Sequence, residues 1–421
     1  MPKFIIKGGS PLSGQIAVSG AKNAALKIIP ASILFSGELE ITNVPQIEDV
    51  SRALELLGDL GASITPTGEK SLRISTENLG KTRLEKTIAD KFRSSIMFVG
   101  PLLARFKEAE FPHPGGCVIG AGSRPIDLAL EGFRAFGATI EHVGSHYRLR
   151  AERLHPIEYF FTTVSVTTTE SFLMTAALIP GRTILRNCAM EPEIEALANF
   201  LSAAGAKIIG AGTPTIIIEG AEKLEAKSPF TVIPDRIETG SFAMLAAASR
   251  SDITITDCVP EHIGNLLAIF DKIGIPYESG SDYLKIKPAK EIRAYSIKTH
   301  EYPGFSTDLQ SPYVVLMTQA QGTSVIHETI YDRRLIWTDM LSQMGADIIM
   351  CDPHRIIVQG PAKLAGKRLI SPDLRAGIAL VIAGLIAEGS TEIDNIYQID
   401  RGYENLEGRL RGLGASIERV E

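Results

Sequence analysis

The sequence has little cysteine, and its apolar runs are short. Its four cysteines lie far apart in the chain and form no C-x-x-C pair. Neither a zinc site nor a disulfide framework is indicated, so we expect no metal and reduced thiols. The longest apolar run, residues 376–387, is too short to span a bilayer and is typical of a buried helix. The first residues lack the apolar core of a signal peptide, which predicts a cytoplasmic protein.

Positive charge is also in short supply. The chain has 43 Lys and Arg against 49 Asp and Glu, a formal net charge of -6 at pH 7. This balance argues against a nucleic-acid or anionic-membrane partner, but it permits a local basic pocket for a small anion. No phosphate-loop or dinucleotide motif is present and the eight histidines are scattered, so no cofactor is expected. The length of 421 residues predicts two or more domains.

A unit of roughly seventy residues recurs six times, and such a period is typical of a repeat architecture. Each copy has an amphipathic helix, a glycine and then a strand, and we expect the glycine just after the end of the helix. These glycines are Gly61, Gly137, Gly205, Gly274, Gly345 and Gly414. A second helix, rich in small residues, and its strand precede each copy. Six α/β units predict two similar domains of three repeats, divided near Pro234.

Cations stand where the first helix of several repeats is predicted to begin. Ser, Thr and Asp at these positions are explained as N-caps. Lys22, Arg93, Arg236 and Arg375 are not, because the helix dipole disfavours a cation at an N-terminus. An anion bound between the cation and the free backbone N–H groups would make this placement favourable. We therefore expect an anion site, in which Asp308 at another helix start could act as a general base.

Cys117 follows two glycines in Pro114-Gly115-Gly116-Cys117. Glycine and proline favour a loop over a helix or a central strand. A loop cysteine near a cation such as Arg124 can be a thiolate, and it could serve as a proton donor or a nucleophile. The alternative is a chance cysteine on a flexible loop.

Six motifs in order resemble the enolpyruvyl transferase superfamily over essentially the whole chain. They are Ser19-Gly20-Ala21-Lys22-Asn23-Ala24-Ala25, Pro114-Gly115-Gly116-Cys117-x-Ile119-Gly120, Arg124-Pro125-Ile126-Asp127-Leu128, Asp235-Arg236-Ile237-Glu238-Thr239-Gly240, Tyr302-Pro303-Gly304-Phe305-x-Thr307-Asp308 and Asp400-Arg401-Gly402-Tyr403-Glu404. The Gly-Gly-Cys loop favours the members that act on UDP-N-acetylglucosamine over those that act on shikimate 3-phosphate.

The resemblance implies an α/β (α+β) fold: two inside-out α/β barrels, each of three βαβαββ-type repeats. One would span residues 22–233 and carry the Cys117 loop. The other would combine 1–21 with 234–421, with the active site in the cleft between them. The implied reaction transfers the enolpyruvyl group of phosphoenolpyruvate to the 3′-hydroxyl of UDP-N-acetylglucosamine and releases phosphate. This is the first committed step of peptidoglycan precursor synthesis, which links the chain to the cell wall, cell shape and cell division.

The resemblance also implies residue roles. Cys117 would protonate the methylene carbon and react with fosfomycin, and Asp308 would be the base, with Lys22 and Arg401 also catalytic. The residues implied to bind phosphoenolpyruvate are Lys22, Asn23, Arg93, Arg124, Arg334, Asp373, Arg375 and Arg401. Those implied to bind the UDP-sugar are Asn23, Arg93, Arg124, Pro125, Ile126, Asp127, Leu128, Ser165, Val166, Asp308 and Ile330. The two substrates are the expected partners.

Three stretches depart from the family's usual pattern. The segment between Cys117 and Arg124 is two residues longer, Thr163 stands where the family often has Lys, and Trp337 stands where it favours His. We expect Trp337 to be a packing residue. A different nucleotide or nucleotide-sugar acceptor therefore stays open. A third hypothesis, a catalytically silent nucleotide-sugar-binding paralogue, is disfavoured because the catalytic set is retained.

Overall fold

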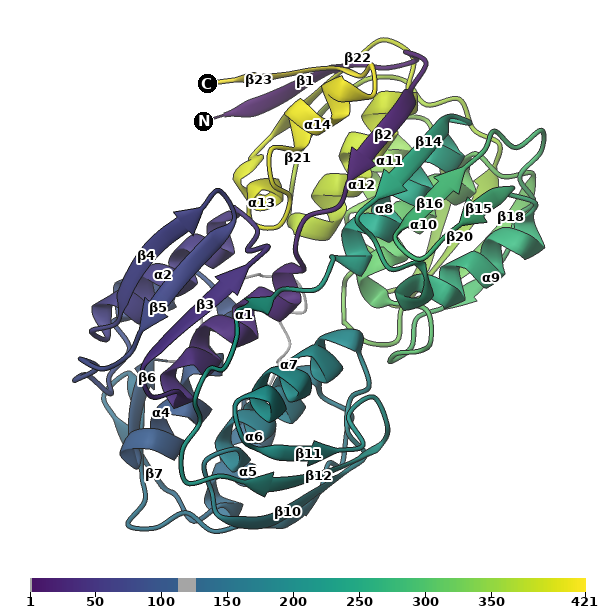
Figure 1. Ribbon diagram of the computed structural model, residues 1–421. Helices are drawn as coiled ribbons and strands as arrows, with labels where there is room; N and C mark the ends of the chain where they lie inside the picture. Colours follow the sequence, from purple (N-terminus) through teal and green to yellow (C-terminus); the bar gives the residue numbers. More distant parts are fainter. Residues whose placement is uncertain (1, 113–125) are drawn as a thin grey trace. The chain divides into compact units, whose positions relative to one another are not determined.

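The computed structural model of the chain describes residues 2–112 and 126–421 (Figure 1). Contacts among these residues divide the chain into two compact units. Unit 1 consists of residues 2–19 and 234–421, and unit 2 of residues 20–112 and 126–233. Gly20 and Ala21 group with unit 2, where the backbone N–H of Ala21 donates to the carbonyl of Ile233 at 2.7 Å.

The described part of unit 2 contains three sheets and two sets of helices. The strands, in sheet order, are β13 (Phe230–Thr231), β3 (Glu38–Thr42), β5 (Ser71–Ser75) and β4 (Ser63–Gly68); β6 (Glu108–Pro112), β8 (His146–Arg150) and β7 (Thr139–Val143); and β11 (Lys207–Ile209), β12 (Thr215–Gly220), β10 (Gly181–Arg186) and β9 (Glu158–Phe160). The first helices of its repeats are α1 (Lys22–Ala31), α4 (Val99–Phe106), which follows the 3-10 turn η2 (Arg93–Phe98), and α6 (Val166–Ala176). The second helices are α2 (Glu48–Asp59), α5 (Asp127–Ala135) and α7 (Pro192–Ala203).

The described part of unit 1 also contains three sheets. The strands, in sheet order, are β21 (Arg368–Ile370), β22 (Ser390–Asp394), β1 (Lys3–Lys7) and β23 (Ser416–Val420); β15 (Tyr277–Ser279), β16 (Tyr283–Ile286), β14 (Asp252–Thr256) and β2 (Ser13–Ala17); and β17 (Ile297–Lys298), β18 (Gly322–His327), β20 (Arg355–Gly360) and β19 (Asp347–Asp352). The first helices are α8 (Arg236–Ala248), α10 (Gln310–Thr318), which follows the 3-10 turn η4 (Thr307–Leu309), and α12 (Leu374–Ile386). The second helices are α9 (Gly264–Ile273), α11 (Thr338–Gln343) and α14 (Leu406–Gly412), with the short α13 (Tyr397–Asp400) between α12 and α14.

The helices form the interior of each unit and the sheets lie outside them. Every residue of α8 and of α10 is buried, and in unit 1 these two helices pack against each other and against α12. A helix that is buried on all sides belongs in a core. Strand β14 instead alternates, with Ile253 and Ile255 buried between more exposed neighbours. One face of the sheet therefore meets the helices and the other faces solvent, which confirms the expected inside-out α/β architecture.

The six repeat glycines all adopt the left-handed backbone conformation. Their φ angles run from 86° at Gly274 to 127° at Gly205. A side chain is strained there, so glycine ends the second helix of each repeat and turns the chain into the next strand. The helical C-terminus expected at each glycine is thereby confirmed. Gly274 takes the C-cap position itself, whereas Gly61 and Gly205 follow the C-cap residue by one.

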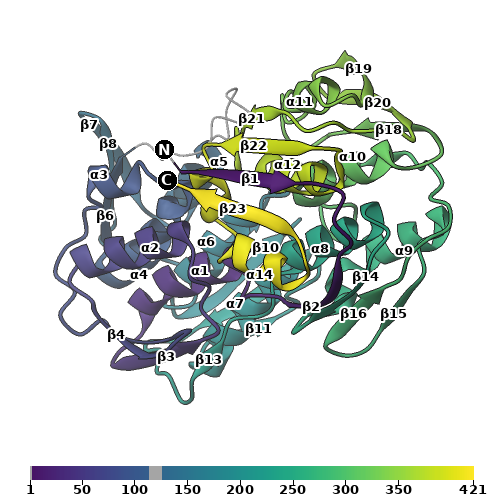
Figure 2. The same cartoon turned by 90° about the horizontal axis from the view of Figure 1, so that it is seen from above.

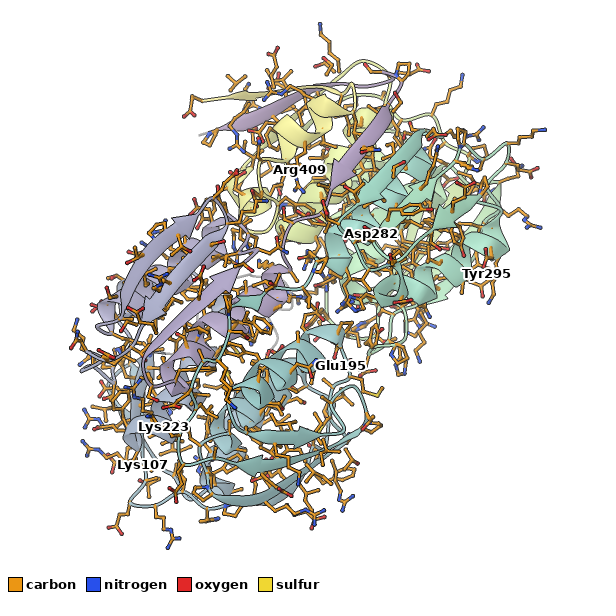
Figure 3. All side chains as sticks on the ribbon, viewed as in Figure 1. Lys107, Glu195, Lys223, Asp282, Tyr295 and Arg409 are labelled. Carbon is orange, nitrogen blue, oxygen red and sulfur yellow. The ribbon has the colours of Figure 1, made fainter. Side chains whose placement is uncertain are left out.

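The N-terminal strand completes a sheet whose other strands come from the C-terminal part of the chain. Strand β1 lies between β22 and β23, where Phe4 pairs with Ile393 on one side and Arg419 on the other (Figure 2). Further on, Glu238 of α8 accepts hydrogen bonds from Ser19 N and from Arg409 of α14 (Arg409 is labelled in Figure 3). A backbone hydrogen bond from Ser19 to this buried carboxylate, which is itself ion-paired with Arg409, thus ties the N-terminal segment into unit 1. Among the described helices, none combines the length and hydropathy that a membrane span requires.

Candidate active site

Asp308 is the centre of a charged cluster in unit 1. It lies in η4, directly before α10, and its side chain is 25% exposed. One oxygen, Oδ1, accepts from Arg334 Nη2 at 2.8 Å, and the other, Oδ2, accepts from Arg375 Nη2 at 2.7 Å. The side chains of Arg334 and Arg375 are 5% and 11% exposed. Two nearly buried guanidinium groups therefore hold one carboxylate, which remains partly open to solvent.

This clamp changes the acidity of the carboxyl group. Burial raises the pKa of Asp308, but the charges and hydrogen bonds of Arg375 and Arg334 outweigh burial and hold that pKa far below its ordinary value. In the same cluster burial lowers the pKa of Arg375, while the charge of Asp308 raises it to a net value above normal. The three groups are charged together at neutral pH, because Asp308 stabilises each arginine and both arginines stabilise Asp308.

Asp373 stands beside Arg375 and caps α12. Its Oδ1 accepts from the backbone N–H groups of Arg375 at 2.7 Å and Ala376 at 3.1 Å. Asp235 caps α8 in the same way, and its Oδ1 accepts from the backbone N–H groups of Ile237 at 2.7 Å and Glu238 at 3.1 Å. These aspartates satisfy the free N–H groups at the helix start, as the N-cap interpretation predicted.

Lys22 and Asp49 form the corresponding pair in unit 2. Lys22 opens α1 without a side-chain cap, and Asp49 lies in the first turn of α2. Lys22 Nζ lies 2.7 Å from Asp49 Oδ2, and the two side chains are 10% and 6% exposed. Sequence reasoning expected an external anion beside Lys22. The structure places a protein carboxylate there, as it does beside Arg375, and no signal in the sequence distinguished Asp49 from an ordinary first-turn acid.

The other predicted residues of unit 2 open or precede helices. Arg93 begins η2 and is half-buried, and Asn23 is half-buried next to Lys22. Ser165 caps α6, since its Oγ accepts from Thr168 N at 3.2 Å. The remaining members lie at the first residues of α6 and α5; they are Val166, Ile126, Asp127 and Leu128. Ile126 is buried and Asp127 is exposed.

The remaining predicted residues of unit 1 lie outside helix interiors. Arg401 follows α13 as its C-cap, is 8% exposed, and donates through Nη1 to Gln398 at 3.1 Å. Ile330 is half-buried in the segment after β18. Trp337 is 5% exposed within the core of unit 1, which confirms it as a packing residue. Cys117, Arg124 and Pro125 lie outside the described residues.

Sequence reasoning missed a buried charge pair in unit 2. Lys27 of α1 lies 3.4 Å from Glu170 of α6, and their side chains are 9% and 0% exposed. Burial raises the pKa of Glu170 to about 8 against the opposing charge of Lys27, and the charges of Glu193 and Glu191 raise it further. Glu170 was visible only as one acid in a helix-start motif, and Lys27 as one cation in an apolar helix.

The arrangement has a clear chemical capacity. Arg334 and Arg375 present a fork of N–H donors of the kind that recognises carboxylate or phosphate. A partly exposed carboxylate lies between them and can accept a proton from a bound alcohol once their hold weakens. Together these groups suit a substrate that joins a small anion to a hydroxyl group.

Comparison with known proteins agrees with this class of fold. Residues 6–410 match the sequence model of the family described as EPSP synthase (3-phosphoshikimate 1-carboxyvinyltransferase). The UDP-N-acetylglucosamine 1-carboxyvinyltransferases of Desulforapulum autotrophicum and Shewanella halifaxensis are 45% and 43% identical to the chain over 423 aligned residues, each covering 100% of both chains. The crystal structure of the enolpyruvyl transferase NikO from Streptomyces tendae aligns with a TM-score of 0.90 at 24% identity, over 100% of this chain and 99% of that one.

The fold is therefore that of the enolpyruvyl transferases, with helices inside and sheets outside in each unit. The chain belongs to the EPSP synthase family, which transfers carboxyvinyl groups. The resemblance that the six motifs predicted is confirmed over the full length of the chain.

Proposed function

We propose that the chain transfers the enolpyruvyl group of phosphoenolpyruvate to the 3′-hydroxyl of UDP-N-acetylglucosamine, with release of phosphate, as a step of peptidoglycan synthesis. The Asp308 carboxylate held between Arg334 and Arg375 is the observation that carries the proposal. It supplies a base and an anion-recognising fork in one cluster. The named activity of relatives 45% and 43% identical over both full chains supports the choice of acceptor.

In the proposed reaction Asp308 takes the proton of the 3′-hydroxyl while the sugar oxygen bonds to C2 of phosphoenolpyruvate. The methylene carbon gains a proton from the Cys117 thiol. The Cys117 thiolate then takes back a methyl proton as the bond between C2 and the phosphate oxygen breaks, which restores the vinyl group, and the proton held by Asp308 leaves with the phosphate. Lys22, Arg93, Arg124 and Arg401, together with the fork, would hold the anionic groups and stabilise the departing phosphate. The UDP-sugar would be bound by the residues that the family resemblance assigns to it, among them Ile330.

In this proposal the two arginines would also control when Asp308 can accept a proton. With both arginines on its oxygens Asp308 is a weak base, because its pKa is far below the ordinary value. An anionic substrate that shares the donors of Arg334 and Arg375 would draw positive charge away from Asp308 and raise the pKa of this carboxyl group. The base would then gain strength when phosphoenolpyruvate is bound, so proton removal would be coupled to the presence of both substrates.

A second candidate keeps the chemistry and changes the acceptor to another nucleotide or nucleotide sugar. Thr163 and Thr167 are exposed on either side of the Ser165 cap, and residues 161–169 contain no cation. A helix start without a lysine binds a diphosphate less strongly, since Lys supplies a point charge that threonine lacks. An acceptor with fewer phosphate charges would suit this segment.

The test is phosphate release from phosphoenolpyruvate with UDP-N-acetylglucosamine present, omitted, or replaced by UDP, UMP or shikimate 3-phosphate. Release that depends on UDP-N-acetylglucosamine supports the proposal. Release only with a different acceptor supports the second candidate. No release with any acceptor would leave a binding protein without transferase activity and would overturn both.

The role of Cys117 is tested separately with fosfomycin. The wild-type chain should gain the mass of one inhibitor, and Cys117→Ala should gain none. Labelling that persists in Cys117→Ala would remove this cysteine from its proposed role. Cys117→Asp keeps a proton donor without a thiolate nucleophile, so it should retain turnover and escape labelling.

A further inference from the structure

Glu328 has no place in the chemistry proposed so far, yet it is among the most heavily partnered residues of unit 1. It follows β18 and is fully buried, with 0% exposure. A buried carboxylate needs hydrogen-bond donors to offset its lost hydration. The structure supplies donors to both oxygens; they are Thr299 Oγ1 at 3.1 Å, Ile330 N at 2.8 Å and Tyr331 N at 3.1 Å on Oε1, and Thr307 Oγ1 at 2.8 Å on Oε2.

Oxygen Oε2 leads to the Asp308 cluster through Thr307. A threonine hydroxyl has a single hydrogen, which here goes to Glu328. The lone pairs of Thr307 Oγ1 then face the other way, and Arg334 Nη1 donates to them at 2.8 Å. The same guanidinium donates through Nη2 to Asp308 at 2.8 Å. A chain of hydrogen bonds therefore fixes the plane of Arg334 relative to Asp308.

Oxygen Oε1 leads to the predicted nucleotide-binding segment. The backbone N–H groups of Ile330 and Tyr331 both donate to it. The ring of Tyr331 in turn lies 5.1 Å from Arg334 Cζ. A single carboxylate therefore holds the segment at Ile330 with one oxygen and the Arg334 relay with the other.

The balance of charges also indicates that Glu328 and Arg334 are coupled. Two arginines face Asp308, so the three side chains alone carry a net positive charge. Burial lowers the pKa of Arg334, but the charges of Asp308 and then Glu328 outweigh it and raise that pKa above its ordinary value. Glu328 is thus a second counter-charge for Arg334, although Thr307 lies between them.

We propose that Glu328 is a positioning residue for enolpyruvyl transfer. It orients Arg334 through Thr307, and it orients the predicted nucleotide-binding segment through the backbone amides of Ile330 and Tyr331. The inference rests on the proposed function, because it assumes that Arg334 binds phosphoenolpyruvate. It adds a residue that carries none of the reacting groups.

The experiment compares two matched threonine variants with Glu328→Gln. Thr307→Val removes the hydroxyl that joins Glu328 to Arg334. Thr299→Val removes a hydroxyl that donates to the opposite oxygen of the same carboxylate and accepts from Thr329 N at 2.8 Å. Binding of phosphoenolpyruvate is measured by calorimetry without acceptor. Glu328→Gln and Thr307→Val should each weaken it about 10-fold, the usual loss for one charge-assisted hydrogen bond. Thr299→Val should change the affinity less than about twofold by the same reasoning, and Thr307→Ser should recover most of what Thr307→Val loses.

A double variant tests whether the two residues act as one relay. If Glu328 acts through Thr307, Glu328→Gln with Thr307→Val should bind no more weakly than the weaker single variant, because coupled residues are not additive. Losses that multiply would overturn the relay. Thermal unfolding of all variants separates this effect from stability, since Thr299→Val should lower the unfolding temperature as well.

The outcomes distinguish the role proposed for Glu328 from the proposed function on which it rests. Wild-type binding of phosphoenolpyruvate that both Glu328→Gln and Thr307→Val leave unchanged would overturn the role of Glu328 alone. A wild-type chain that binds no phosphoenolpyruvate, and releases no phosphate from it with any of the acceptors, would overturn the proposed function and this role with it. Because acceptor is absent, the readout does not depend on which nucleotide the chain uses.

Discussion

Two carboxyl groups near helix starts, Asp308 in unit 1 and Glu170 in unit 2, have pKa values shifted in opposite directions. Asp308 accepts one hydrogen bond from each of two arginines, at 2.8 Å and 2.7 Å. Among the described residues, Glu170 has one counter-ion, Lys27, at 3.4 Å. The pKa of Asp308 lies far below its ordinary value, whereas the pKa of Glu170 rises to about 8.

The difference shows what decides the charge of a carboxyl group in this protein. Burial raises the pKa at both positions. At Asp308 two short charge-assisted hydrogen bonds from planar guanidinium groups overcome it. At Glu170 a single ammonium beyond the usual 2.7–2.9 Å range does not, and Glu193 and Glu191 add repulsion. Donor number and geometry therefore outweigh the mere presence of an opposite charge.

The largest effect should come from removing the charge of Asp308. Asp308→Asn keeps the shape but cannot accept a proton, so kcat for phosphate release should fall about 10²–10⁴-fold, the range for loss of a general base. The matched control is Asp394→Asn, because the Asp394 side chain is also 25% exposed and pairs with an arginine of its own unit, Arg368. The control should keep kcat within about twofold, as expected for an exposed surface pair. Equal losses in both variants would mean that Asp308 acts only through stability.

The two ion pairs should also respond differently when the cation is removed. Arg375→Met leaves a carboxylate that stays charged at neutral pH, which should lower the stability by about 3 kcal/mol, as for a broken buried pair. Glu170 has a pKa of about 8 and is protonated at pH 6 with or without Lys27, so Lys27→Met leaves no unpaired anion and its loss at pH 6 should be smaller. Thermal unfolding of the full chain at pH 6 measures both. A larger loss for Lys27→Met would contradict the comparison.

The pH dependence of stability sharpens the contrast further. Since the pKa of Glu170 rises from 4.5 to about 8 on folding, the folded state binds its proton more tightly. The contribution of this group is complete below pH 4.5 and is lost as pH rises to about 8. Glu170→Gln cannot titrate, so its unfolding temperature relative to wild type should increase from pH 5 to pH 8.

The control for this pH series is Glu219→Gln. Glu219 pairs with Lys207 on the surface of the same unit, and its side chain is 47% exposed. Glu219→Gln makes the same substitution at an exposed position and leaves the buried acid in place, so its difference from wild type should not change with pH over that range. The contribution of Asp308 to stability has the opposite pH dependence. Because the pKa of Asp308 is lowered in the folded state, this contribution is present at neutral pH and is lost as pH falls below the ordinary value of 3.8.

The smallest effect concerns the two matched helix caps. Asp235→Ala and Asp373→Ala each remove one oxygen that accepts at 2.7 Å and 3.1 Å, so each should lower the free energy of unfolding by about 1 kcal/mol. If Asp373 also binds phosphoenolpyruvate, only Asp373→Ala should weaken that binding, which calorimetry measures. Asp373→Asn keeps the cap and should separate the two roles.

The repeat architecture could be read from the chain because its signals are local. A glycine at the end of a helix reports a positive φ wherever that glycine stands, and all six repeat glycines adopt it. Asp235 and Asp373 were interpretable as caps for the same reason, since a cap bonds N–H groups two and three residues ahead. Asp308, Arg334 and Arg375 were named through the motifs and the family resemblance.

The pairing of these charges was decided by the tertiary structure. Arg334 and Arg375 lie 26 and 67 residues from Asp308 in the chain, and only the packing of α10 against α12 and the return of the chain after β18 bring the three together. The same holds for Lys22 with Asp49 and for Lys27 with Glu170. A sequence shows which groups can carry charge and where helices begin. Distance, burial and the number of donors determine which of them stay charged, and these quantities exist only after folding.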